Sequence, residues 1–152
     1  MKTLLIALGT VGALTFPAQA HAGAAAVCIE REKNSGGNGY DSEYFVRWGK
    51  SPNVDGATAL RAAKRDHKKS YPNSIPYCYD SGSSKYPGGG HMVLIKSGRI
   101  KDGAGDHYNR WTLGVGTTRQ EAISDAVFQM QQRDGVWSHG THGYTIEEEH
   151  EI

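Results

Sequence analysis

The stretch RWTLGVGTTRQEAISDAVFQMQQRD, residues 110–134, joins a predicted strand directly to a predicted helix. Every second residue from Trp111 to Val115 is apolar, which is typical of a strand with one buried face. Thr118 and Glu121 then form a capping box, and the apolar residues that follow recur at i, i+3 and i+4 spacing. The stretch therefore predicts a strand, a short glycine turn and an amphipathic helix.

The same order of elements occurs once earlier in the chain. EYFVRWG is predicted to form a strand and ATALRAAKRDHKK a helix. Each half also has one predicted strand before and one after this strand-helix pair: AVCIERE and SIPYCYD in the first half, HMVLIKS and GYTIEEE in the second. We therefore predict an α+β fold of two tandem strand-loop-strand-helix-strand repeats, about residues 25–80 and 90–150, joined by a Gly/Ser-rich linker. Small residues on the inner side of both helices allow close packing. We expect one mostly antiparallel sheet with both helices on one face.

The glycine turns and alanine spacings of the two halves carry a resemblance. Gly49-Lys50-Ser51 precedes the Ala59-x-x-x-Ala63 helix, and Gly116-Thr117-Thr118 precedes the helix with Ala122-x-x-x-Ala126. These motifs resemble an uncharacterised family of small exported bacterial proteins with paired strand–Gly-x-Ser/Thr–Ala-rich-helix repeats. The second half departs from that family because it contains no cysteine. The resemblance implies export and a repeated architecture, with no assigned activity.

Residues 1–22 have the pattern of a signal peptide. Lys2 is followed by an apolar run from Leu4 to Phe16, and small residues suitable for cleavage occur at Ala18-Gln19-Ala20 and Ala20-His21-Ala22. The run of about 13 residues is shorter than the roughly 20 that a spanning helix needs. We expect residues 23–152 to form a single globular domain that is periplasmic or secreted, with no integral membrane span.

The chain contains two cysteines, Cys28 and Cys78, and neither has a nearby cysteine or histidine at zinc-site spacing. Because an exported chain meets an oxidising compartment, we predict one disulfide between them.

Histidines provide the candidate metal ligands. His139 and His142 are three residues apart, and the neighbouring glycines Gly140 and Gly143 predict a loop rather than a helix. With His91 or His107 they could bind zinc, copper or nickel, although histidine and glycine in polar turns before strands would explain the same pattern. We therefore expect no cofactor, with zinc or another transition metal as the alternative.

Known catalytic motifs are missing from the sequence. It contains neither a Gly-x-Ser-x-Gly elbow nor a His-Glu-x-x-His zinc motif. Aromatic residues, by contrast, recur in or beside glycine-rich segments, as in adaptable binding surfaces. The candidate partner-binding residues are Tyr40, Tyr108, Trp137 and Tyr144.

The first predicted helix has a cationic outer side. Its candidate anion-binding residues are Arg61, Lys64, Arg65, Lys68 and Lys69, interrupted by Asp66. This side could contact phosphates of the cell envelope, or it could be an ordinary solvated face. The formal net charge of +1 argues against nucleic acid as the partner.

Together these features favour binding over catalysis. We expect a small exported bacterial protein that acts as a binding module on a protein or cell-envelope ligand, for example as an inhibitor or immunity-type protein. The alternative is a metal-binding protein or metal-dependent enzyme that uses the loop histidines.

Overall fold

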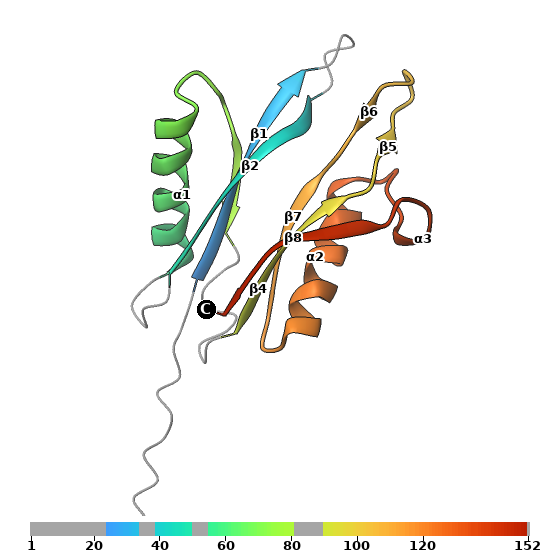
Figure 1. Ribbon diagram of the computed structural model, residues 1–152. Coiled ribbons are helices and arrows are strands. Elements are labelled where there is room, and N and C mark those ends of the chain that lie inside the picture. Colours follow the sequence, from blue (N-terminus) through green and yellow to red (C-terminus); the bar gives the residue numbers. More distant parts are fainter. Residues whose placement is uncertain (1–23, 34–38, 50–54, 81–89, 152) are drawn as a thin grey trace, which may run out of the picture.

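The structure, a computed structural model, describes residues 24–33, 39–49, 55–80 and 90–151 (Figure 1). In chain order its elements are β1 (Ala24–Lys33), β2 (Gly39–Gly49), α1 (Gly56–Ser70), β3 (Tyr77–Asp80), β4 (His91–Ser97), β5 (Ile100–Lys101), β6 (His107–Tyr108), β7 (Trp111–Gly116), α2 (Arg119–Arg133), α3 (His139–His142) and β8 (Tyr144–Glu151).

Two three-stranded antiparallel sheets make up most of the fold. Their strand orders are β2-β1-β3 and β7-β4-β8, and β5 pairs with β6 as a separate short hairpin. In each large sheet the earliest strand lies in the middle, and the strand that follows the helix pairs with one of its sides. The two halves of the chain therefore share one strand order.

The two sheets pack face to face, and each helix covers the outer face of one sheet (Figure 1). Val27 of β1, Leu94 of β4 and Leu113 of β7 belong to the core between the sheets. Ala63 of α1 packs on the far side of the first sheet, and Ala126 of α2 packs on the far side of the second. The layers follow the order α1, first sheet, second sheet, α2.

The expected α+β class is confirmed, but the expected single sheet with both helices on one face is wrong. Residues 24–29 of β1 and 92–95 of β4 are all fully buried. A strand that is buried on both faces needs a layer on each side. Here a helix provides one layer and the other sheet provides the second. The continuous apolar run MVLI in β4 indicates burial on both faces, because a strand with one exposed face would alternate apolar and polar residues.

Close packing of α2 depends on a small residue in β7. A Cβ atom at Gly114 would lie 2.1 Å from the carbonyl oxygen of Ala122 and 2.2 Å from the backbone nitrogen of Ala126. The hydroxyl of Thr112 donates a hydrogen bond of 2.8 Å to the carbonyl oxygen of Ala126, and this bond is buried. The helix backbone therefore lies directly on the strand.

The expected disulfide is present and joins β1 to β3. Cys28 and Cys78 are directly opposite each other in the antiparallel register, with Cα atoms 4.1 Å apart. The bond ties the edge strand β3 to the central strand of its sheet.

Some expectations fall on other parts of the chain. The expected signal peptide, residues 1–22, and residues 81–89 of the expected linker lie outside the described residues. Within the described ranges, no helix is both long enough and apolar enough to cross a membrane.

Candidate anion-binding surface

Helix α1 has a small buried side that lies against the first sheet. At its start the carboxylate of Asp55 accepts a hydrogen bond of 2.6 Å from the backbone N–H of Thr58. This bond is the main reason that the pKa of Asp55 is lowered. Gly56, Ala59 and Ala63 are buried. The small side chains of Ala59 and Ala63 let the helix lie close to β1, and a Cβ atom at Gly56 would lie 2.7 Å from the carboxylate of Asp80 in β3.

The opposite side of α1 is cationic, and we call it the basic face. Its five members are exposed: Arg61, Lys64, Arg65, Lys68 and Lys69. At 3.6 residues per turn they cover roughly 140° of the helix circumference and about 12 Å of its length. The residues that sequence analysis selected as anion-binding candidates are thus brought together on one surface.

Asp66 interrupts the cations in the sequence but not on the surface. Its side chain is 19% exposed and forms an ion pair with Arg47 of β2, and it also lies 3.4 Å from the Nε atom of Arg65. Burial alone would raise the pKa of Asp66, but the two guanidinium groups outweigh it and lower the pKa. The carboxylate therefore stays ionised on the flank of the helix, where Arg47 neutralises it.

The lysines of the basic face have few acidic neighbours. In the part of the chain that the structure describes, Lys64 and Lys69 have no carboxylate partner, and Lys68 donates to the carbonyl oxygen of Pro72. Arg61 donates to the hydroxyl of Thr58 at 2.8 Å. Most of the positive charge on this face is thus available to a ligand.

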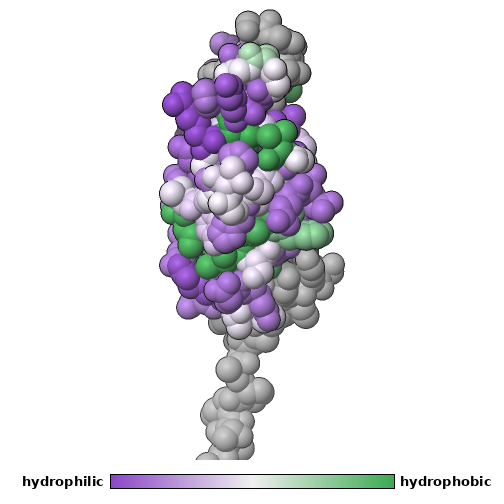
Figure 2. All heavy atoms as spheres, turned by 90° about the vertical axis from the view of Figure 1, so that its right-hand side faces the viewer, coloured by the Kyte–Doolittle hydropathy of each residue, from purple (hydrophilic) through white to green (hydrophobic). Residues whose placement is uncertain are grey.

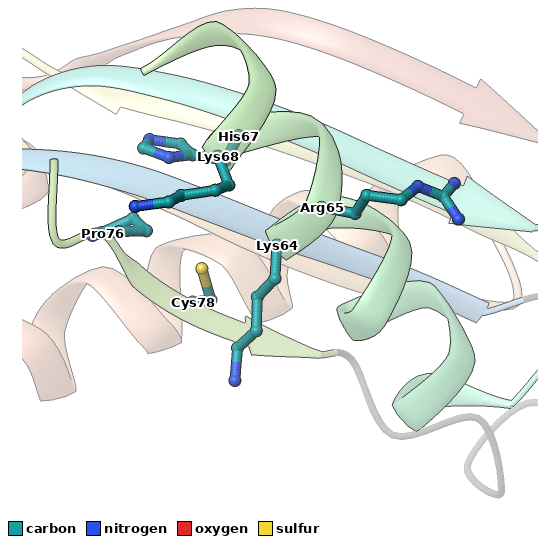
Figure 3. Close-up of a pocket in the computed structure, with 6 residues that line it drawn as sticks. All are labelled: Lys64, Arg65, His67, Lys68, Pro76 and Cys78. Atoms are coloured by element: carbon teal, nitrogen blue, oxygen red, sulfur yellow. The ribbon is translucent and has the colours of Figure 1, made fainter. Parts of the chain in front are cut away.

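An open pocket of about 480 Å³ lies between the basic face and β3 (Figure 3). Its lining residues are Lys64, Arg65, His67, Lys68, Pro76 and Cys78. In Figure 3, Lys64 and Lys68 extend from α1 on the side of β3, with Cys78 between them, while Arg65 points away. His67 is fully buried, and its ring lies 5.0 Å from the ring of Tyr71. The pocket thus has apolar walls and two lysines beside its mouth.

The sequence did not predict a second group of cations, which gathers around Tyr77 of β3. Tyr77 is 40% exposed, and the guanidinium groups of Arg31 and Arg133 lie 4.5 and 4.6 Å from the centre of its ring. Cation–π contacts of this kind link β1, β3 and the end of α2. The three residues come from distant parts of the chain, so no local motif could have predicted the contact.

The four candidate metal ligands do not converge. Tyr144, which follows the His139–His142 segment, pairs with Ser97 at one end of β4, whereas His91 lies at the other end. Six residues of strand separate these ends by about 20 Å. His107 is exposed on the short strand β6. Among the described residues, no group of three or more histidine, cysteine or acidic side chains could hold a metal ion.

The segment from His139 to His142 is one turn of helix, so the predicted loop is wrong. Gly143 ends this helix, α3, with φ of 64°. The backbone N–H of Ser138 donates to Nδ1 of His142 at 3.0 Å, and the ring of His139 stacks on that of Trp137. Both histidines therefore make local structural contacts, and Nδ1 of His142 uses its lone pair to accept a backbone hydrogen bond.

The predicted partner-binding aromatics that the structure describes pack against the core. Trp137 is 4% exposed and donates from its indole nitrogen to the carbonyl oxygen of Gly143 at 3.0 Å, so its ring offers little surface to a partner. Tyr108 and Tyr144 are half-buried and pack against the core between α2 and its sheet. The side chain of Tyr40 lies outside the described residues.

Asp134 organises this region and was not singled out from the sequence. Its side chain is 4% exposed, forms an ion pair of 3.0 Å with Arg110, and accepts from the backbone N–H groups of Val136 and Trp137. Burial would raise the pKa of Asp134, but hydrogen bonds from Arg110 and Tyr108 lower it overall. Burial and the bond to Asp134 in turn raise the pKa of Tyr108 to about 12. This cluster positions the segment after α2.

The side of the molecule opposite α1 has a mixed surface. Figure 2 shows its hydrophobic side chains in separate patches among hydrophilic ones. Exposed apolar residues from this half of the chain include Phe128 and Val136. Charge of one sign is concentrated instead on α1, which makes the basic face and its pocket the candidate functional site.

Comparisons with known proteins add no family to this description. No protein-family model matches the chain, and no curated protein or solved structure matches it significantly.

Proposed function

We propose that the protein is an exported binding module that uses the basic face of α1 to hold an anionic lipid surface of the cell envelope. The observation that carries this proposal is the grouping of five exposed cations along one helix, with Asp66 turned aside to Arg47. Because Asp66 is turned toward Arg47, the basic face is far more positive than the net charge of +1 for the whole chain suggests.

The acidic residues at the C-terminal end are too distant to cancel this charge. Glu147, Glu148 and Glu149 belong to β8, in the second sheet, and Glu149 pairs with Arg119. Packed layers are about 10 Å apart, so α1 and the second sheet are separated by roughly 20 Å. That distance exceeds the screening length of about 8 Å at physiological ionic strength. The acidic residues of β8 therefore contribute little to the field that an anion meets at the basic face.

A pair of matched double variants tests the proposal. Lys64→Gln/Lys69→Gln removes two charges from the basic face, whereas Arg99→Gln/Lys101→Gln removes two exposed charges from the other half. Each basic residue near an anionic membrane surface contributes about 1 kcal/mol, so the first variant should bind roughly 30-fold more weakly. Co-sedimentation with phosphatidylglycerol vesicles, with phosphatidylcholine vesicles as the neutral control, measures this difference.

The result can contradict the proposal in two ways. If both double variants weakened vesicle binding equally, the net charge of the protein, and not the basic face, would determine binding. No binding of the unmodified protein to phosphatidylglycerol vesicles would reject a lipid surface as the ligand, and capture of an acidic envelope protein would then favour the inhibitor or immunity role.

A further inference from the structure

We propose that the pocket between α1 and β3 accommodates the alkyl chain of an anionic amphiphile whose headgroup is held by Lys64 and Lys68. This inference rests on the proposed function, because the same two lysines contribute to the basic face. It adds a chemical class of ligand and a specific place for its apolar part.

The pocket has the size and position of a small-molecule site. Its volume of about 480 Å³ lies within the range that is usual for ligand pockets. It lies where α1 meets the edge strand β3, and the disulfide fixes that strand to β1 at Cys78. The covalent link keeps the floor of the pocket in place, so a ligand does not have to order it.

The walls of the pocket are apolar although its rim is charged. Pro76 and the sulfur of Cys78 present little hydrogen-bonding capacity to a ligand, and the ring of His67 behind them is fully buried. The lysines contribute their methylene stems to the lining. The ammonium group of Lys64 can extend into water, while that of Lys68 lies at the carbonyl oxygen of Pro72 on the rim.

This combination selects an amphiphile over simpler ligands. An inorganic anion would pair with the ammonium groups but would leave the apolar walls of the pocket exposed to water. A neutral apolar molecule would fill the walls and obtain nothing from Lys64, which has no carboxylate partner among the described residues. An alkyl chain with an anionic headgroup satisfies both parts, since apolar burial and charge pairing then act in one molecule.

A chain-length series of monomeric alkyl sulfates tests the inference directly. Calorimetric titration with butyl, hexyl and octyl sulfate should show affinity rising by up to fourfold for each added methylene that is buried. Inorganic sulfate and the uncharged octyl glucoside should each bind more weakly than octyl sulfate. In NMR spectra, octyl sulfate should shift the backbone amide signals of Lys64 and Cys78.

Single substitutions on one helix provide the matched control. Lys64→Gln removes a lysine that lines the pocket, whereas Lys69→Gln removes one that does not. We expect Lys64→Gln to weaken octyl sulfate binding at least fivefold and Lys69→Gln to weaken it less than twofold. Equal effects of the two variants, or an affinity independent of chain length, would overturn the inference. If vesicle binding still depended on the basic face, the proposed function would survive that result. If alkyl sulfates bound as expected but vesicles did not, only the proposed function would fail.

Discussion

Substitution of Asp134 by alanine is expected to destabilise the protein strongly, although this residue lies far from the basic face. The change removes a buried carboxylate that accepts hydrogen bonds from Arg110 and from two backbone N–H groups. Arg110 would keep its charge with a side chain only 16% exposed. The guanidinium would then lose its ion pair at a largely desolvated position, where its remaining neighbours include the ring of Tyr108 at 4.8 Å.

The expected magnitude follows from this burial. Breaking a buried ion pair by removal of one partner costs about 3–5 kcal/mol, and the partial exposure of Arg110 places the expected loss near the lower end, about 3 kcal/mol. Asp134→Asn should cost roughly half as much, because the amide oxygen can still accept from the two backbone groups, at about 1 kcal/mol each.

Urea denaturation at neutral pH, followed by circular dichroism, measures these losses in the free energy of unfolding. The control is Glu149→Ala, which breaks the ion pair between Glu149 and Arg119. The side chain of Arg119 is 53% exposed and that of Glu149 is 49% exposed. That exposed pair should contribute less than about 1 kcal/mol. If Asp134→Ala cost no more than Glu149→Ala, the assigned role of the Asp134 cluster would be refuted.

Three further predictions concern the packing of α2, the disulfide and the Tyr108 hydroxyl. Gly114→Ala should reduce the free energy of unfolding by about 3 kcal/mol, because its Cβ would overlap the α2 backbone; Gly140→Ala, with open space at its Cβ, is the control in the same urea assay. Reduction of the Cys28–Cys78 bond, which spans 50 residues, should cost about 4 kcal/mol in the chain-entropy model; an unchanged thermal midpoint after reduction would contradict this. The pKa of Tyr108 is raised from 10.0 to about 12 in the folded protein, so its stabilising contribution is complete below pH 10 and is lost as pH rises toward 12. Tyr108→Phe should flatten this alkaline loss of stability, and an unaltered pH profile would refute the assignment.

Local structure was predictable where one stretch of sequence determines it. Thr118 caps the start of α2 as predicted, with its hydroxyl accepting from the backbone N–H of Glu121 at 3.2 Å. The carboxylate of Glu121 in turn accepts from the backbone N–H of Thr117 at 2.9 Å. The Cys28–Cys78 pairing followed from the scarcity of cysteines. The common outer face of the α1 cations followed from helical spacing alone.

Features that depend on contacts between distant residues were not predictable in the same way. The alternation in AVCIERE indicated one buried face, yet Val27 packs against the second sheet and Cys28 against the α1 side. Trp137 lies two residues after Gly135 and reads as a loop residue, but the core beneath α2 buries its ring. The pocket requires α1 and β3 to lie side by side, and only the tertiary structure supplies that arrangement.

The most direct test of the central claim, that the basic face of α1 is the binding surface, is an NMR titration of the unmodified protein with phosphatidylglycerol bicelles. The account predicts that the signals of Arg61, Lys64 and Lys69 broaden first, while those of α2 and β8 remain sharp. Early broadening of the α2 or β8 signals, with α1 unaffected, would contradict it.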